Sequence, residues 1–152
     1  MESICRIVVF QIGTEYFGMD ITRIEKIIER TDAIAAPSEK SSNVDGILNL
    51  HEDMIPILNL HERLRLKPLL EQGIQYFMII SFNKKLMAFQ VDKVEQYCEV
   101  PSQCLCLAPS LLLSTGTRYF RWVVKINGRI VLILDPEWLF KEVGESDIGK
   151  CE

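Results

Sequence analysis

Apolar and polar positions along the chain predict a protein made mainly of short β-strands. The apolar runs 4–12 and 76–82 are each followed by a turn signal, which is typical of strands. Residues 16–28 and 86–100 come next, and we expect the first of these segments to bend near Thr22. Its isoleucines would also suit one face of a helix, but the β-branched and aromatic residues of the second segment favour strands for both.

Turn and cap signals divide the rest of the chain into hairpins and short helices. Residues 47–50 and 54–58 predict a hairpin, and Asn127-Gly128 predicts a tight turn between strands at 119–126 and 129–134. Because Pro56 has no N–H to donate, its strand is expected at a sheet edge or a bulge. Short helices are expected to follow two capping residues, Asn59 and Asp135.

Three segments predict connections rather than strands. These are a polar loop at 32–43, a linker at 67–75 and a long, leucine-rich connection at 101–117. We expect the leucines of the last segment (Leu105, Leu107, Leu111, Leu112, Leu113) to cover the open end of a barrel. Residues 147–152 are expected to form a frayed tail.

The chain contains the same pattern twice. Residues 86–95 repeat the pattern of residues 16–25, and residues 130–135 repeat that of residues 54–59. A repeat of this length indicates one supersecondary unit used twice, here about five strands and a short helix. We therefore predict an all-β protein with a few short helices, in which two pseudo-symmetric small β-barrels pack together.

Length places both barrels in one domain. With 152 residues in all, each half alone would be marginally stable, so the two barrels are expected to share a core. The prediction is a single domain at 1–146, with a first barrel at about 4–66 and a second at about 75–142.

Composition narrows the classes of function. Apolar residues make up 48% and charged residues 25% of the chain, and the formal net charge is −4. This composition is typical of a globular protein, and the negative charge argues against a nucleic-acid surface. We see neither a signal peptide nor an apolar stretch long enough for a bilayer, so we expect a cytoplasmic protein with no direct membrane insertion.

Nothing in the sequence indicates catalysis, a metal or a cofactor. The cysteine count is odd, at five, and no C-x-x-C pair occurs, so we expect reduced thiols. A metal or redox role for Cys98, Cys104 and Cys106 is the alternative. The two histidines, His51 and His61, accompany no nucleophile motif or phosphate loop, and we therefore predict that the protein is not an enzyme.

Several motifs, taken in order, resemble the CheW-like family of chemotaxis coupling proteins. The family's Tyr-Gly-Ile-Asp hairpin corresponds to residues 16–20, Tyr-Phe-Gly-Met-Asp. Its Gly-x-x-Asn-Leu-Arg-Gly signature corresponds to residues 46–52, Gly-Ile-Leu-Asn-Leu-His-Glu, and a Pro-containing strand follows in both. The second half contributes residues 88–94 and 130–135, so the resemblance covers nearly the whole chain.

The resemblance implies two intertwined five-stranded barrels and a non-catalytic adaptor. Such adaptors couple the regulatory domain of a CheA-type histidine kinase to the cytoplasmic tips of chemoreceptors, in arrays at the inner face of the membrane. It places kinase contacts at Ile24, Lys26, Ile28, His51 and Glu52, and receptor contacts at Tyr76, Val94 and Tyr97. The isoleucines, Val94 and Tyr97 would alternatively fill the barrels, and residues 51–52 would alternatively form a solvated turn.

Three departures from the family pattern concern charge. His51-Glu52 replaces Arg-Gly, Lys26 stands where a carboxylate is usual, and Asn59 replaces Asp. Lys26 and Glu52 would form the reverse of the family's charge pair, and interface charges set partner choice. We therefore expect a variant adaptor with altered partners. The alternatives are a competing or ring-forming array component in a non-flagellar pathway, or a regulatory fragment that other proteins fuse to a receiver domain.

Overall fold

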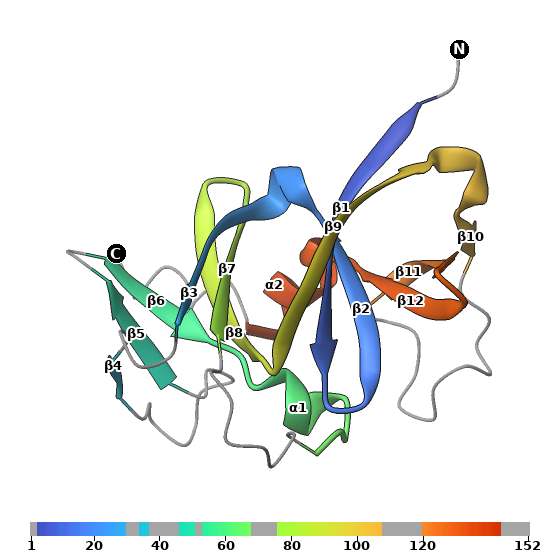
Figure 1. The fold of residues 1–152 in the computed structure, drawn as a ribbon. Coiled ribbons are helices and arrows are strands. Elements are labelled where there is room, and N and C mark those ends of the chain that lie inside the picture. The colour runs from blue at the N-terminus through green and yellow to red at the C-terminus, as the bar shows by residue number, and fades with distance from the viewer. Residues whose placement is uncertain are drawn as a thin grey trace.

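Two α-helices and twelve strands make up the computed structural model, which describes residues 3–29, 34–36, 46–50, 53–67, 76–107 and 120–143 (Figure 1). The first half contains β1 (Ile4–Ile12), β2 (Glu15–Asp20), the 3₁₀-helix η1 (Ile21–Arg23), β3 (Ile24–Glu29), β4 (Ile34–Ala36), β5 (Gly46–Leu50), β6 (Asp53–Ile57) and α1 (Leu60–Arg63). The second half contains β7 (Tyr76–Phe82), β8 (Lys85–Val91), β9 (Lys93–Pro101), the 3₁₀-helix η3 (Ser102–Cys104), β10 (Cys106–Leu107), β11 (Phe120–Ile126), β12 (Arg129–Leu134) and α2 (Pro136–Val143). The protein is thus mainly β, as the sequence predicts.

The two halves have the same order of elements, which accounts for the sequence repeat. Each half contains a hairpin, then four further strands, then a helix, so that β1 corresponds to β7 and β6 to β12. The strands form two six-stranded sheets. We call the one with order β10-β11-β12-β2-β1-β9 sheet A and the one with order β4-β5-β6-β8-β7-β3 sheet B. Replacing each strand by its counterpart converts one order into the other.

The two sheets exchange hairpins. Sheet A contains β9 to β12 of the second half and the β1–β2 hairpin of the first. Sheet B contains β3 to β6 of the first half and the β7–β8 hairpin of the second. Each borrowed hairpin joins its host through one parallel pairing, β2 with β12 and β8 with β6. This exchange of hairpins agrees with the intertwined units that the family resemblance implies. Each sheet has six strands where five were expected, because the borrowed hairpin adds two strands to four.

Three apolar clusters show why the halves fold as one unit. A central cluster, which includes Phe10 and Phe17 of sheet A and Phe89 of sheet B, lies between the sheets. Sheet A encloses a second cluster around Val9 and sheet B a third around Ile79. Successive side chains of β1 and β7 point alternately to the central cluster and to the cluster of their own sheet. Both faces of these strands are therefore apolar. The two halves therefore share one core, as expected from their small size.

Local turn chemistry follows the sequence closely. Asn127 and Gly128 have φ values of 52° and 79°, as a two-residue turn with two left-handed residues requires. Gly13, in the β1–β2 turn, has φ 61°, and a Cβ at this position would lie 2.9 Å from the Lys67 carbonyl oxygen. Both predicted helix caps are confirmed. The Asn59 side chain accepts from the backbone N–H of Glu62, and the Asp135 side chain caps α2 in the same way.

The position of Pro56 differs from the expectation of an edge or a bulge. Strand β6 lies inside sheet B, between β5 and β8, and Pro56 is buried there opposite Ile47 of β5. The ladder between β6 and β8 includes only Ile57, paired with Ala88, so the absent N–H of Pro56 removes no bond on that side.

The leucine-rich connection is described only in part. Leu105 packs against the cluster of sheet A, as expected for a residue that covers it. Leu107 is 69% exposed, and residues 111–113 lie outside the described residues, as do most of the linker 67–75 and the tail 147–152.

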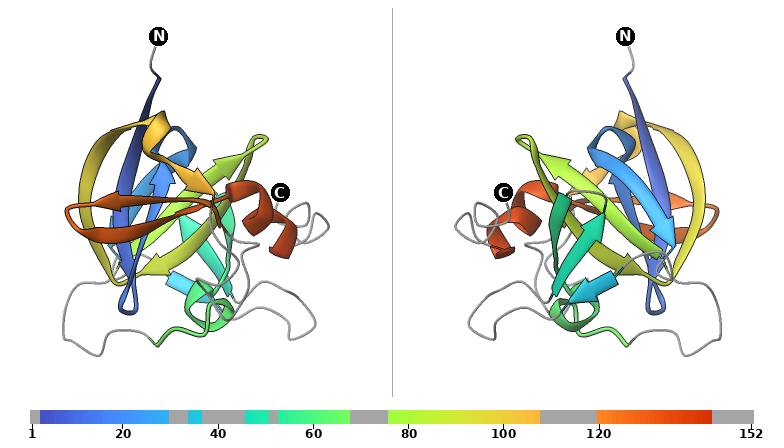
Figure 2. Two further views of the ribbon diagram at one scale, coloured as in Figure 1. Left: turned by 90° about the vertical axis from the view of Figure 1, so that its right-hand side faces the viewer. Right: turned by 90° about the vertical axis from the view of Figure 1, so that its left-hand side faces the viewer.

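A buried His–Asp contact joins the sheets at α1. Nε2 of His61 lies 2.7 Å from Oδ2 of Asp92, and both side chains are at least nine-tenths buried. The same oxygen accepts the backbone N–H of Gly13 at 2.6 Å. Asp92 is the single residue between β8 of sheet B and β9 of sheet A, and α1 lies beside the tip of the β1–β2 hairpin (Figures 1 and 2). The other Asp92 oxygen, Oδ1, is buried without a hydrogen-bond partner among the described residues.

Candidate interaction surface

A capped turn carries the chain from sheet A into β3, which holds three of the predicted kinase contacts. The Asp20 side chain accepts from the backbone N–H of Thr22 at 2.9 Å and from its hydroxyl at 2.7 Å. An Asp at this position satisfies a donor that the first turn of η1 leaves free. The predicted bend near Thr22 is confirmed, because residues 16–28 divide into β2, η1 and β3.

Strand β3 is an edge strand of sheet B, and a bulge changes the direction of its side chains. The register with β7 shifts between Ile24 and Lys26, so Glu25 is the extra residue. Ile24 is half-buried against the central cluster, and Ile28 is half-buried against the cluster of sheet B. Lys26 is exposed. The two isoleucines thus serve the packing of two cores, while Lys26 is directly accessible to a partner.

The two remaining predicted kinase contacts, His51 and Glu52, lie outside the described residues. The strands on either side of them are described, and Leu50 of β5 pairs with Asp53 of β6. The predicted hairpin between β5 and β6 is therefore confirmed. The reversed charge pair between Lys26 and Glu52 stays a prediction.

A second bulge directs the predicted receptor contacts on β9 to one side. Val94 lies opposite Phe10 and Tyr97 opposite Val8, and both partners belong to the central cluster. Residues three apart on a regular strand point to opposite faces, but the register shift makes Glu95 an extra residue and puts Val94 and Tyr97 on the same face. The bulge thus allows these two side chains to form one surface.

Charged neighbours hold the Tyr97 side chain at the surface. The ring is 49% exposed, and its hydroxyl donates to Oε2 of Glu99 at 3.0 Å. Nε of Arg6 lies 3.3 Å from the same oxygen. Desolvation and then the hydrogen bond and negative charge of Glu99 raise the pKa of Tyr97 above its usual value, while Arg6 opposes the shift. An exposed aromatic ring with a positioned polar tip is well suited to an interface.

Tyr76, the third predicted receptor contact, lies on the other sheet. It is half-buried on β7, opposite Glu29 of β3 and Val91 of β8. Tyr76, Ile24 and Val94 all pack against the central cluster, from opposite sheets. The structure therefore places the predicted receptor contacts on both sides of the central core, and it places Tyr76 next to the strand of the predicted kinase contacts. We call Tyr76, Val94 and Tyr97 the inter-sheet surface.

Sequence analysis missed the residues that position Tyr97. Arg6 and Glu99 have opposite charges on strands that lie far apart in the chain, and β1 pairs with β9 to bring them together. Neither residue belongs to a motif, and the pairing of β1 with β9 depends on the exchange of hairpins. Arg6 is the single charged residue of β1, and Glu99 is one of several on β9, so the sequence does not identify them as partners.

Histidine, cysteine and carboxylate side chains are dispersed over the described residues. They contain no group of three or more His, Cys, Asp or Glu residues placed to hold a metal ion. His61, one of the two candidate acid–base residues, is 6% exposed and is held by Asp92. The helices that the structure describes are too short and too polar to span a bilayer.

Comparison with known proteins gives one consistent result. Residues 6–144 match the protein family described as the CheW-like domain. The chemotaxis protein CheW of Treponema pallidum is 30% identical over 139 residues, which cover 89% of this chain and 81% of that protein. The chemotaxis protein CheW of Thermotoga maritima is 25% identical over 134 residues, covering 88% and 86% of the two chains.

A solved structure has the same fold. The scaffolding protein TtCheW from Thermoanaerobacter tengcongensis superimposes with a TM-score of 0.76, covering 88% of this chain and 90% of that one. The sequence identity is 19%, so this likeness concerns the fold alone.

Proposed function

Because this chain belongs to the CheW-like domain family, we propose that it is a non-catalytic adaptor that couples the regulatory domain of a CheA-type histidine kinase to the cytoplasmic tips of chemoreceptors. The family match over residues 6–144 carries the general adaptor role. The proposal for receptors depends on the inter-sheet surface, where apolar and aromatic side chains of both sheets are accessible around one core.

Receptor tips are helical hairpins, and their chemistry suits this surface. A helix docks its apolar face into a groove through side chains spaced one turn apart. Val94 and Tyr97 lie on the same face of β9, and Tyr76 packs against the central cluster from sheet B. Tyr97 is the most accessible aromatic residue of the group and is fixed by Glu99, so it is the expected centre of the contact.

Replacing Tyr97 by alanine is expected to weaken receptor binding strongly while it changes the stability of the protein little. Truncation of a central aromatic contact costs about 2 kcal/mol, or roughly thirtyfold in Kd. The measurement is isothermal titration of the full chain with a receptor-tip fragment, beside thermal denaturation. Tyr97→Phe keeps the ring and is the matched control. Unchanged receptor affinity for Tyr97→Ala would remove β9 from the proposed receptor site.

The proposed kinase site combines β3 with the tip of the β5–β6 hairpin. Lys26 is exposed, and its charge is opposite to the one that the family pattern has at this position. Exposed charges at the rim of an interface change association rate and partner choice more than they change stability. The altered charges at 26 and 52 therefore support a kinase partner with complementary changes.

Glu52→Lys is expected to weaken binding to the cognate kinase regulatory domain by about tenfold, while the melting temperature stays nearly constant. Lys26→Glu should act in the same direction, and the double exchange should restore part of the affinity if the two charges are coupled. Surface plasmon resonance at two salt concentrations measures both effects.

Glu62→Lys, an exposed charge reversal on α1, serves as the control for these changes. A large loss of stability with kinase binding intact would mean that residue 52 serves the fold. Ordinary affinity for a kinase domain that carries the standard charges would contradict altered partner choice.

A further inference from the structure

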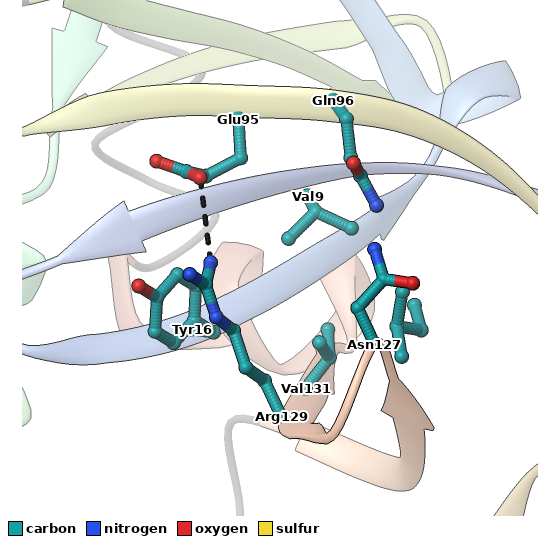
Figure 3. A pocket seen from close by; sticks show the side chains of 8 residues that line it. Val9, Tyr16, Glu95, Gln96, Asn127, Arg129 and Val131 are labelled. Carbon is teal, nitrogen blue, oxygen red and sulfur yellow. Dashed lines mark ion pairs between the residues drawn. The ribbon is translucent and has the colours of Figure 1, made fainter.

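A pocket opens in sheet A, on the side of β9 opposite to the proposed receptor contacts Val94 and Tyr97. Its volume is about 280 Å³. The apolar part of its lining consists of Val9, Ile126 and Val131, which belong to the cluster enclosed by sheet A. The pocket is thus continuous with a buried apolar core and lies between β9 and the β11–β12 turn (Figure 3).

Two opposite charges meet at one side of this pocket. Nη1 of Arg129 lies 3.5 Å from Oε1 of Glu95, and its guanidinium lies over the Tyr16 ring, 4.5 Å from the ring centroid. The bulge in β9 makes Glu95 the extra residue of that strand, and bulges commonly redirect a side chain next to a site. At 3.5 Å the pair is longer than a direct hydrogen bond, and both side chains are partly exposed.

Two neutral amides lie at the other side. The side chains of Gln96 and Asn127 point toward each other from β9 and from the β11–β12 turn, with Val9 and Val131 between them and the charged pair (Figure 3). Each amide can donate and accept hydrogen bonds. The lining therefore has a cation and an anion side by side, an apolar middle and a neutral polar far side.

We propose that this pocket binds a free, neutral α-amino acid. The ligand's carboxylate would meet Arg129 and its ammonium group Glu95, while its side chain would lie over the valines toward the amides. A simple anion would be repelled by Glu95 and a simple cation by Arg129, so a zwitterion is the charge pattern that fits both. The pocket volume of about 280 Å³ lies at the lower end of the range for small-molecule sites, which is about 300–1,000 Å³. The pocket can therefore hold a single amino acid but not a nucleotide.

Breaking the resident ion pair is a small obstacle. An exposed pair of this kind contributes little to stability, because water and salt screen it. The Arg129 guanidinium also stacks on the face of the Tyr16 ring. Because this contact does not involve Glu95, Arg129 would keep its position when Glu95 binds a ligand. This binding would make the adaptor responsive to a metabolite.

Ligand-observed NMR and calorimetry on the full chain test the proposal with leucine and glutamine as probes. Both amino acids are expected to bind saturably, with Kd in the micromolar to millimolar range. N-acetyl-leucine, which lacks the ammonium charge, and leucinamide, which lacks the carboxylate, should each bind roughly tenfold more weakly. Arg129→Gln and Glu95→Gln should weaken leucine binding by a similar factor, whereas Lys125→Gln on the same hairpin should not.

Absence of saturable binding for both amino acids would overturn the proposal. So would equal binding of leucine and leucinamide, or binding that neither Arg129→Gln nor Glu95→Gln changes. Any of these results would mean that the Arg129–Glu95 pair only connects β9 to the hairpin. The capped ligands test the unaltered chain, so the result does not depend on the variants folding, and kinase and receptor binding can be measured separately.

Discussion

Asp92→Ala is expected to destabilise the protein by on the order of 2–4 kcal/mol, because two buried donors lose their acceptor and each such loss costs about 1–3 kcal/mol. The Asp92 carboxylate accepts from both His61 and the backbone of Gly13, and alanine would leave both buried groups without their acceptor. Because folded proteins are stable by about 5–15 kcal/mol, such a loss is a large share of the total. Urea denaturation measures it.

A double-mutant cycle identifies the source of this loss. His61→Ala and Asp92→Ala together should cost clearly less than their sum, because each single change already removes the shared contact. Asp53→Ala, which removes an exposed carboxylate on β6, is the control and should have little effect. Additive losses within roughly 0.5 kcal/mol would show that the two side chains act independently.

Phe10→Ala should destabilise both sheets together, by about 3–5 kcal/mol. Phe10 is fully buried, and its ring centroid lies 6.3 Å from that of Phe17 in sheet A and 5.8 Å from that of Phe89 in sheet B. A cavity at this position therefore removes contacts between the sheets as well as within one of them. Phe10→Leu leaves a smaller cavity and should cost less than Phe10→Ala.

The two tryptophans report on the two parts of the fold. Trp122 lies on β11 of sheet A, and Trp138 lies on α2, which packs against β7 of sheet B. Two variants that each keep one tryptophan should unfold with the same midpoint as each other. This should hold both without and with Phe10→Ala, which lowers the midpoint seen by both probes, as a single cooperative unit requires. Separate midpoints would contradict the shared core.

The elements of the fold could be predicted because they depend on local chemistry. The Asn127-Gly128 turn requires two left-handed residues, and Asn59 and Asp135 are good caps. The repeat likewise predicted two related units. The partner strands could not be predicted, since the same pattern is consistent with a hairpin that stays in its own half or joins the other. The prediction of an edge or bulge position for Pro56 was wrong, because β8 of the second half pairs with β6 and places it inside sheet B.

The candidate site could be predicted in part. Val94 and Tyr97 were identified through the family resemblance, and the bulge at Glu95 explains why both reach one face. The bulge shifts the alternation of apolar positions along β9 by one residue, but the spacing of Val94 and Tyr97 does not by itself identify Glu95 as the extra residue. The contacts of Arg6 with Glu99 and of His61 with Asp92 depend on strands and helices that meet only after folding.

The sequence by itself determined the strand-rich class, the twofold repeat, the turns and the helix caps, because each depends on residues close together in the chain. Tertiary structure alone decided the exchange of hairpins between the sheets, the common core around Phe10 and the surfaces formed by residues of both halves. The physical reason is burial. The β1–β2 and β7–β8 hairpins are apolar on both faces, so each needs a second sheet to cover it, and only the folded chain specifies which sheet that is.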